Sequence, residues 1–180
     1  MTDAIGQLPQ LLVSATVQQD VTCFGGNNGA ALVTSTSGGT PNYTYVWSDP
    51  TGQTGPVANN LSAGTFTVTV TDANACTASS TVSITEGAPI TVTPSITNVN
   101  CFGETNGSIS LSSTSHTLVG FSWSNGPFGN PLTGVGAGTY IVTVTDNQNC
   151  QDSFSFTVTE PTELTTSIAQ VSGITSVSYT

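Results

Sequence analysis

The chain has 180 residues, with ten acidic side chains, one histidine and neither lysine nor arginine, which gives a formal net charge of −10. Without cationic side chains it cannot form the basic surface that binds nucleic-acid phosphates or anionic lipid headgroups, so we expect no nucleic-acid partner and no direct membrane insertion. Its richness in Thr, Ser, Val and Gly favours strands and turns over helices.

Two sequence motifs occur twice in the same order. CFGGNNG at Cys23–Gly29 returns as CFGETNG at Cys101–Gly107, and VTVTDANAC at Val68–Cys76 returns as VTVTDNQNC at Val142–Cys150. Such repetition indicates tandem copies of one small domain. In chain order we predict the tail of a preceding repeat or a linker (residues 1–9), a first β-sandwich repeat (10–88), a second (89–161), and the start of a third repeat or a strand for assembly (162–180). Because Met1–Leu8 lacks the basic and apolar regions of a signal peptide, we expect the chain to be a piece of a longer exported protein.

The first repeat contains six predicted strands separated by turn residues. They cover about Leu11–Thr22, Ala30–Thr36, Tyr43–Ser48, Gly55–Leu61, Thr65–Asp72 and Ala78–Thr85. In the fifth strand Phe66, Val68 and Val70 alternate with threonines, which predicts that they face a core. The second repeat has the same pattern at Tyr140, Val142 and Val144. Asn28-Gly29 is interpreted as a turn with positive φ before the second strand.

One tryptophan stands in the third predicted strand of each repeat, at Trp47 and Trp123. We predict that both are core anchors, because a large aromatic side chain in a short strand has most to gain from burial. The predicted fold class is all-β, with one antiparallel Ig-like β-sandwich and one disulfide in each repeat.

Four cysteines occupy matching positions in the two repeats: Cys23, Cys76, Cys101 and Cys150. Zinc would require closer pairs or more histidines, and free thiols are the other alternative. If consecutive strands alternate in direction, the turns after the first and the fifth strand lie at the same end of a sandwich. We therefore predict the disulfides Cys23–Cys76 and Cys101–Cys150, and an extracellular location, where disulfides persist.

Side chains with oxygen atoms end the fifth strand in both repeats. They are Asp72 with Asn74, and Asp146 with Asn147 and Asn149. One interpretation is a calcium site at Asp72, Asn74, Asp146 and Asn149, because Ca²⁺ binds oxygen ligands. The other is a turn in which the Asp carboxylate accepts hydrogen bonds from its own backbone. No other cofactor is expected.

The sequence offers little for catalysis. His116 is the single histidine, and it falls in a predicted surface turn that the first repeat builds differently. A Ser/His/Asp triad would have to use His116, and phosphate chemistry would lack a cationic partner. The acidic residues stand singly in turns and do not suggest the carboxylate pair of a glycosidase. We expect that the protein is not an enzyme.

The motifs together resemble the SprB-repeat family. They are CFGxxNG, the aromatic-x-W-S strand (Tyr45–Ser48 and Phe121–Ser124), LSAGTF or VGAGTY, VTVTDxxxC, and a closing ITE or VTEP. The resemblance covers almost all of residues 10–161, and the second repeat departs from it at Ser115–Val119, where the GGTPNY turn is missing. It implies Ig-like sandwiches in tandem, export through the type IX secretion system, and a role in surface adhesion or gliding motility. Because the shared motifs are those of folding, it implies no binding residue.

We therefore predict a structural repeat segment of an extracellular bacterial surface adhesin or filament. The expected partners are neighbouring repeats or other copies of the chain, and surface polysaccharide is a further candidate. The alternative function is a carbohydrate-binding module with exposed aromatic side chains. The aromatic candidates for it are Tyr43, Tyr45, Phe24, Phe102 and Phe128.

Overall fold

The computed structural model describes residues 9–126 and 128–166. Within these residues every regular element is a β-strand, which confirms the all-β prediction. This part of the chain accordingly holds no helix able to cross a membrane. Residues 1–8 of the predicted upstream tail, and residues 167–180 of the predicted third-repeat start, lie outside the described residues.

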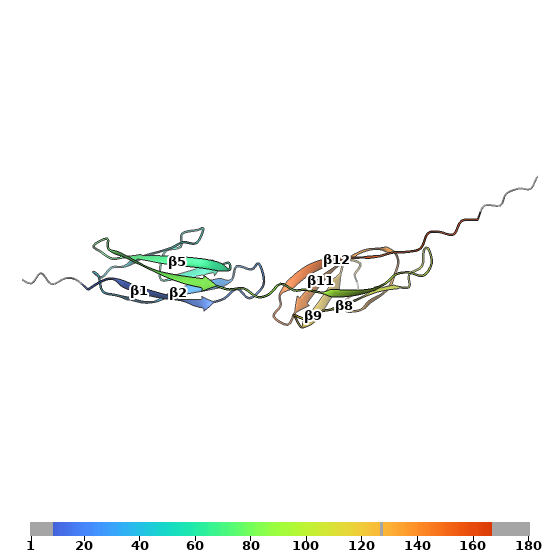
Figure 1. The fold of residues 1–180 in the computed structure, drawn as a ribbon, viewed down its shortest axis with the longest axis horizontal. Coiled ribbons are helices and arrows are strands. Elements are labelled where there is room, and N and C mark those ends of the chain that lie inside the picture. The colour runs from blue at the N-terminus through green and yellow to red at the C-terminus, as the bar shows by residue number, and fades with distance from the viewer. Residues whose placement is uncertain (1–8, 127, 167–180) are drawn as a thin grey trace, which may run out of the picture. The chain divides into compact units, whose positions relative to one another are not determined.

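Twelve strands follow one another along the described chain (Figure 1). The strands of the first repeat are β1 (Leu12–Gln19), β2 (Gly29–Ser37), β3 (Thr44–Trp47), β4 (Val57–Leu61), β5 (Gly64–Thr71) and β6 (Thr77–Ile84). Those of the second are β7 (Thr93–Thr97), β8 (Gly107–Ser112), β9 (Leu118–Trp123), β10 (Leu132–Val135), β11 (Gly138–Asp146) and β12 (Gln151–Val158). All six strands predicted for the first repeat are present, because its turn residues separate them clearly.

By its contacts the chain divides into two compact units. Unit 1 takes the residues up to Val92 together with Ser113–Gly120 and Val144–Asp152. Unit 2 takes Thr93–Ser112, Phe121–Thr143 and the residues from Ser153 onward. Two short segments of the second sequence repeat therefore belong to unit 1.

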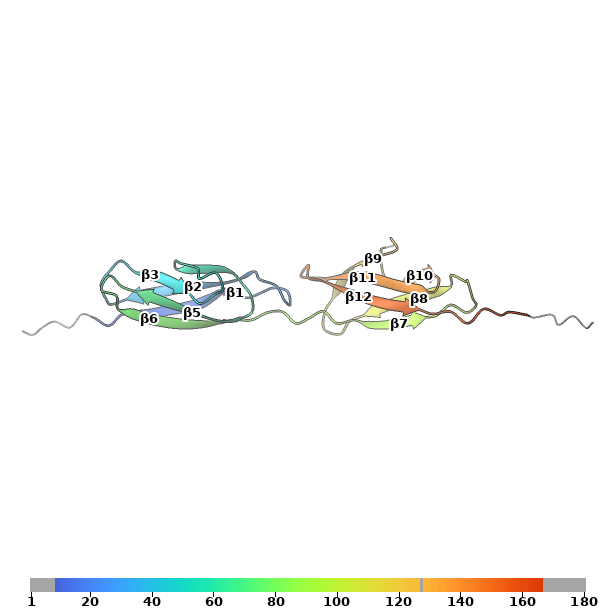
Figure 2. The same ribbon diagram turned by 90° about the horizontal axis from the view of Figure 1, so that it is seen from above.

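Unit 1 contains two three-stranded sheets, in the orders β1-β2-β4 and β3-β5-β6 (Figure 2). Neighbouring strands pair antiparallel in both sheets. The buried core takes Ala31 and Ala58 from the first sheet and Trp47, Val68 and Val82 from the second. Side chains of two sheets thus close one core, so unit 1 is an antiparallel β-sandwich.

The predicted core positions of the first repeat are confirmed. Trp47 is only 1% exposed, and its indole Nε1–H donates a hydrogen bond to the Gly55 carbonyl at 3.1 Å. Val68 and Val70 are fully buried, and Phe66 is buried beside them. Side chains of a strand point alternately to its two faces, so the apolar residues of β5 face the core and the intervening threonines lie on the other face.

The direction of the strands differs from the strict alternation expected. β1 and β6 run parallel, because Ala15 lies beside Ser80 and Val21 forms a parallel bridge with Glu86. Following the antiparallel pairings from β1 and β6 shows that β3 and β4 run in the same direction. β3 pairs with the second half of β5 and β4 with the first half of β2, so the two short strands together cross the sandwich once.

Because β1 and β6 run parallel, the predicted Cys23–Cys76 bridge is wrong. Cys23 follows the end of β1, whereas Cys76 precedes the start of β6, and parallel strands put these positions at opposite ends of unit 1. The eight residues of β1 alone span about 26 Å at ~3.3 Å per residue. Bridged cysteines require Cα atoms within roughly 7 Å of each other.

Unit 2 has its own core. It contains the antiparallel order β10-β8-β7 and the larger part of the sheet β12-β11-β9. Its buried side chains include Ile109, Leu111, Trp123, Leu132 and Val135. The Trp123 Nε1–H donates to the Gly129 carbonyl at 2.9 Å, which matches the contact of Trp47. The second predicted core anchor is therefore also confirmed.

Candidate functional site

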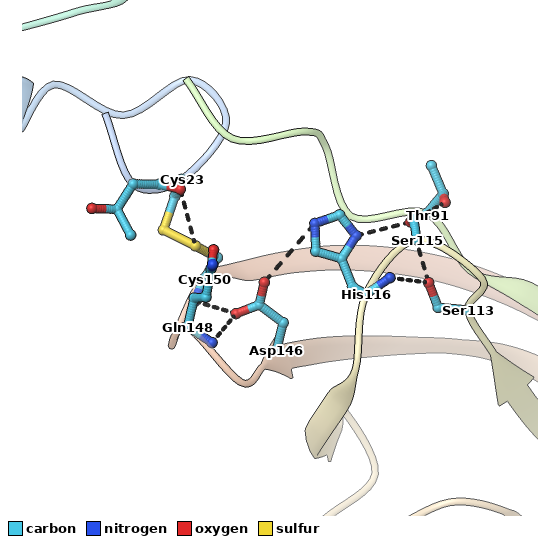
Figure 3. Close-up of polar contacts among 9 residues, drawn as sticks. Cys23, Thr91, Ser113, Ser115, His116, Asp146, Gln148 and Cys150 are labelled. Atoms are coloured by element: carbon cyan, nitrogen blue, oxygen red, sulfur yellow. Dashed lines mark hydrogen bonds and ion pairs between the residues drawn. A yellow bond between two sulfur atoms is a disulfide. The ribbon is translucent and has the colours of Figure 1, made fainter. Parts of the chain in front are cut away.

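The most chemically distinctive group in the described residues surrounds a disulfide that joins Cys23 to Cys150 (Figure 3). Their Cα atoms are 5.5 Å apart, although the residues are separated by 127 positions in sequence. Both belong to unit 1. Cys76 and Cys101 are free and exposed, so the predicted pairings Cys23–Cys76 and Cys101–Cys150 are both wrong. Of the four cysteines predicted to form disulfides, Cys23 and Cys150 do so, with each other, and Cys76 and Cys101 do not.

The loop that carries Cys23 is held by hydrogen bonds within the repeated CFGxxNG motif. The Cys23 carbonyl accepts from the Gly26 N–H at 3.0 Å, and the Glu86 carboxylate accepts from the Gly25 N–H at 2.6 Å. Gly25 has φ of 69°, which favours glycine at the third motif position. The loop therefore holds the Cys23 sulfur on a defined backbone.

Asn28 has a different role from the positive-φ turn that we predicted, and that prediction is wrong. Neither Asn28 nor Gly29 has positive φ. The Asn28 side chain instead accepts a hydrogen bond from the Thr22 N–H at 3.0 Å, one residue before the cysteine. Gly29 is required by space, because a Cβ there would lie 2.7 Å from the Leu61 carbonyl oxygen.

The turn that carries Cys150 is closed by Asp146. Its Oδ1 accepts hydrogen bonds from the N–H groups of Gln148 and Cys150, at 2.8 and 2.9 Å. Asn149 completes the turn with φ of 63°, a left-handed conformation that Asn tolerates. Asp146 and Asn149 thus have the positions expected of a structural turn.

Asp72 closes the equivalent turn of the first repeat. Its carboxylate accepts three backbone N–H groups, from Thr40, Asn74 and Cys76, at 2.8–2.9 Å. The Thr40 N–H, followed by those of Cys76 and Asn74, lowers the pKa of Asp72 below its usual 3.8, because these donors favour the charged form. Among the described residues no group of three His, Cys, Asp or Glu side chains could hold a metal ion. Calcium binding at Asp72, Asn74, Asp146 and Asn149 stays a prediction.

His116 lies beside Asp146, which closes the turn of Cys150, and its side chain is only 13% exposed, deeper than the surface position we expected. Its Nε2 is 4.0 Å from Oδ2 of the buried Asp146, and its Nδ1 is 2.8 Å from the Ser115 hydroxyl. The Ser115 hydroxyl also lies 2.9 Å from that of Thr91. Figure 3 shows these residues beside the disulfide. Asp146 Oδ2 has no hydrogen-bond partner in the described structure. The His116 ring is thus the polar group that faces this oxygen.

The residue types of a catalytic triad meet here, but their arrangement does not match one. A triad needs the imidazole to connect an acid to a nucleophile that faces a substrate. The Ser115 hydroxyl instead lies 2.9 Å from that of Thr91 and 3.4 Å from that of Ser113, and none of the grooves described below is lined by Ser115 or His116. We find no nucleophile aimed at a pocket in this group.

The predicted sugar-binding aromatics do not gather at one place. Tyr43 and Tyr45 pack against the core of unit 1, and the Tyr43 hydroxyl donates to the Gly38 carbonyl. Phe24, Phe102 and Phe128 are more than half exposed, each on a separate loop. A cavity of about 290 Å³ near Asp49 has only the buried Phe66 as an aromatic wall.

The fold and the site define a class: a tandem β-sandwich protein with a disulfide, whose repeated polar motifs hold its own loops and turns. Residues 15–52 match the family model described as SprB repeat. This match confirms the resemblance to the SprB-repeat family predicted from the motifs. The search of curated proteins found no match.

Three of the solved structures to which this chain is similar have low sequence identities and low TM-scores. Murine CEACAM1b is 14% identical, with 83% of this chain and 100% of that chain covered and a TM-score of 0.34. The mouse nectin-like molecule 4 ectodomain (Ig1–Ig3) is 10% identical, with coverages of 88% and 67% and a TM-score of 0.32. DIP-gamma IG1+IG2 is 9% identical, with coverages of 84% and 98% and a TM-score of 0.34. At these low scores we take nothing about function from the similarities.

Proposed function

We propose that this chain is a structural segment of an extracellular bacterial surface adhesin or filament, in which the repeats act as spacers. The observation that supports it is the SprB-repeat match, together with motifs that recur in tandem and serve folding. Export through the type IX secretion system and a role in adhesion or gliding motility belong to the same proposal. Its partners are neighbouring repeats or other copies of the chain, with surface polysaccharide as a further candidate.

The disulfide supplies a mechanical reason for this role. A force applied to the two ends of the chain passes through the Cys23–Cys150 bond, because the covalent bond connects these residues directly. The residues between them in sequence then bear no force. The intervening residues include ten of the twelve described strands, from β2 to β11. Most strands are therefore protected from being pulled out while the bridge is intact, which suits a spacer under tension.

Pulling single molecules by their ends tests this mechanical role. Reducing the bridge should lengthen the fully extended chain by roughly 440 Å, since the cysteines are 127 residues apart and each residue spans at most ~3.5 Å. The double variant Cys23→Ser/Cys150→Ser should show the long extension without reductant, and Cys76→Ser should not. Equal extension with and without reductant would contradict the mechanical role.

Cell-surface labelling and a glycan array test the proposed function itself. Antibodies against the chain should label intact cells that make the protein, and any binding of the purified chain to polysaccharide should not depend on its exposed aromatic side chains. Phe128→Ala and Phe102→Ala are the matched variants, because both side chains are exposed. Selective glycan binding that one of these variants abolishes would favour the carbohydrate-binding module, and exclusively internal labelling would exclude a surface spacer.

A further inference from the structure

We propose that Cys76 and Cys101 are the two halves of a second bridge, which forms head to tail between two copies of this chain. Cys101 of one copy bonds to Cys76 of the next, in the same way that Cys23 bonds to Cys150 within one copy. The proposal rests on the proposed spacer function and deepens it by naming the residues that join segments. Each free cysteine has a bonded equivalent in the other repeat: Cys101 matches Cys23, and Cys76 matches Cys150.

The loop of Cys101 already has the geometry of the bonded Cys23 loop. The Gly103 N–H donates to the Glu160 carboxylate at 2.8 Å, as Gly25 does to Glu86. The Asn106 side chain accepts from the Asn100 N–H at 3.1 Å, as Asn28 does from Thr22. Gly103 has φ of 77°, close to the 69° of Gly25. The thiol is therefore presented by a loop that needs no rearrangement to form the same kind of bond.

The turn of Cys76 likewise has the geometry of the bonded Cys150 turn. Oδ1 of Asp72 accepts the Cys76 N–H at 2.8 Å, and Oδ1 of Asp146 accepts the Cys150 N–H at 2.9 Å. The Asp72 N–H donates to the Cys76 carbonyl at 2.9 Å, and the matching bond in the second repeat is 3.0 Å. Ala75 has φ of 64°, against 63° for Asn149. The Cys101 loop and the Cys76 turn thus have the backbone geometry of the bonded pair. They differ from it in exposure, because both free cysteines are exposed and Cys150 is buried.

The surroundings of the cysteines show which segment would fit. Around the existing bridge, a groove of about 280 Å³ is lined by Cys23, Phe24 and Ile90 and closed by Cys150–Asp152. Around Cys101 the groove is about 470 Å³, lined by Asn100–Phe102 and Pro161–Leu164, and among the described residues its lining includes no segment equivalent to Cys150–Asp152. In the first repeat, the residues that correspond to Cys150–Asp152 are Cys76–Ala78.

The accessible apolar side chains support a second copy as the occupant. Phe102 is 52% exposed and Leu164 is 92% exposed, and both line the groove beside Cys101. Cys76 lines an accessible groove of about 490 Å³ together with Pro9–Val13. Each copy has one free Cys76 and one free Cys101. A dimer joined through one of each therefore still has a free Cys76 at one end and a free Cys101 at the other. Such a head-to-tail contact between different surfaces produces open chains.

Bond formation requires an oxidant, for which we name a low-molecular-weight disulfide. The Cys101 thiolate attacks one sulfur of that disulfide, giving a mixed disulfide and releasing one thiolate. The Cys76 thiolate of the second copy then attacks the Cys101 sulfur and releases the other. Two protein thiols are oxidised to one bridge, and the oxidant is reduced to two thiols, which take up the two protons that the protein thiols lose.

The test uses two variants that each retain one half. Cys76→Ser keeps Cys101, Cys101→Ser keeps Cys76, and both retain the Cys23–Cys150 bridge. They are mixed with oxidised and reduced glutathione at high salt, which screens repulsion between chains of charge −10. Heterodimers joined through Cys76 and Cys101 should exceed homodimers at least about ten-fold, because the two prebuilt halves raise the effective concentration of the thiols. The unaltered chain should give a ladder of oligomers whose peptide map contains the same link.

A groove variant separates docking from random collision. Phe102→Ala should lower the heterodimer yield roughly ten-fold, and Phe128→Ala, which is exposed on another loop of unit 2, should leave it unchanged. Homodimers as abundant as heterodimers, a Cys76–Cys101 bond within one chain, or thiols capped only by glutathione would each overturn the proposal. None of these outcomes bears on surface labelling or glycan binding, so failure of the bridge is distinguishable from failure of the proposed function.

Discussion

The turns at Asp72–Cys76 and Asp146–Cys150 have the same local geometry and different surroundings. In both, Oδ1 of the aspartate accepts the N–H groups two and four residues further on. Oδ2 of Asp72 also accepts the Thr40 N–H, whereas Oδ2 of Asp146 has no hydrogen bond and lies 4.0 Å from His116. The local motif therefore builds the turn, and the facing loop decides whether its carboxylate is satisfied.

The facing loops explain this difference. In the first repeat Gly39 lies so close that a Cβ would be 2.6 Å from Oδ2 of Asp72, and its φ is 61°. A glycine there lets the backbone approach and the next N–H reach the carboxylate. The second repeat has no Gly-Gly-Thr-Pro turn, and the His116 side chain occupies the facing position instead. Two copies of one motif can thus share a turn without sharing its stabilisation.

Breaking the Cys23–Cys150 bridge should have the largest effect on stability, and it distinguishes the bonded turn from the free one. For a loop closed over 127 residues the chain-entropy estimate is about 5 kcal/mol, and measured losses often fall below this figure. Denaturation of the double variant Cys23→Ala/Cys150→Ala should show a loss of this order. Cys76→Ser and Cys101→Ser are the controls, since both thiols are free and exposed. A control that costs as much would mean that the free cysteines are structural.

Trp47→Ala should destabilise unit 1 by roughly 3–5 kcal/mol, because it leaves a large cavity in a buried core. Trp123→Ala is the matched change in unit 2, and it should have a similar cost there. Urea unfolding followed at both units measures the two losses. If Trp47→Ala left the unfolding of unit 1 unchanged, the core assignment would fail.

Asp72→Asn should destabilise the protein more than Asp146→Asn does at neutral pH. An amide cannot accept all three N–H groups that Asp72 accepts, and its NH₂ would face one of these donors. Asp146→Asn can keep the acceptor oxygen at Oδ1 and replaces only Oδ2, which has no hydrogen bond, so it should cost less. Parallel denaturation curves of the two variants measure the difference. Equal costs would show that the facing loop has no energetic role.

Acid should weaken unit 1 through Asp49 and Asp72. Burial alone would raise the pKa of Asp49, but hydrogen bonds led by that of the Thr51 hydroxyl outweigh burial and lower it, and the pKa of Asp72 is lowered too. Because these pKa values lie below the unfolded value of 3.8, the carboxylates stabilise the fold above that pH. Their contribution is lost as the pH falls through the folded values. Stability measured between neutral pH and pH ~2 should show this loss, and Asp72→Asn should reduce it.

Much of this protein follows from sequence patterns that act over short distances. The alternation at Phe66, Val68 and Val70 predicts one buried face, because side chains of a strand point to opposite sides. The turn residues predict where six strands begin and end, and the tandem motifs predict the SprB-repeat resemblance, which the match at residues 15–52 confirms. Trp47 was assigned to the core for the same kind of reason, since its size makes burial favourable.

Only the tertiary structure decided which cysteines meet and what faces Asp146. The cysteine pairing depends on strand direction, and direction depends on β3 and β4 joining different sheets while together crossing the sandwich once. No local pattern records that choice, because the partner of a strand is set by contacts far away in sequence. Likewise, nothing near His116 in the sequence shows that its ring lies beside Asp146, thirty positions away. A chain's hydrogen-bonding motifs specify its turns, and the packing of distant strands specifies where those turns meet.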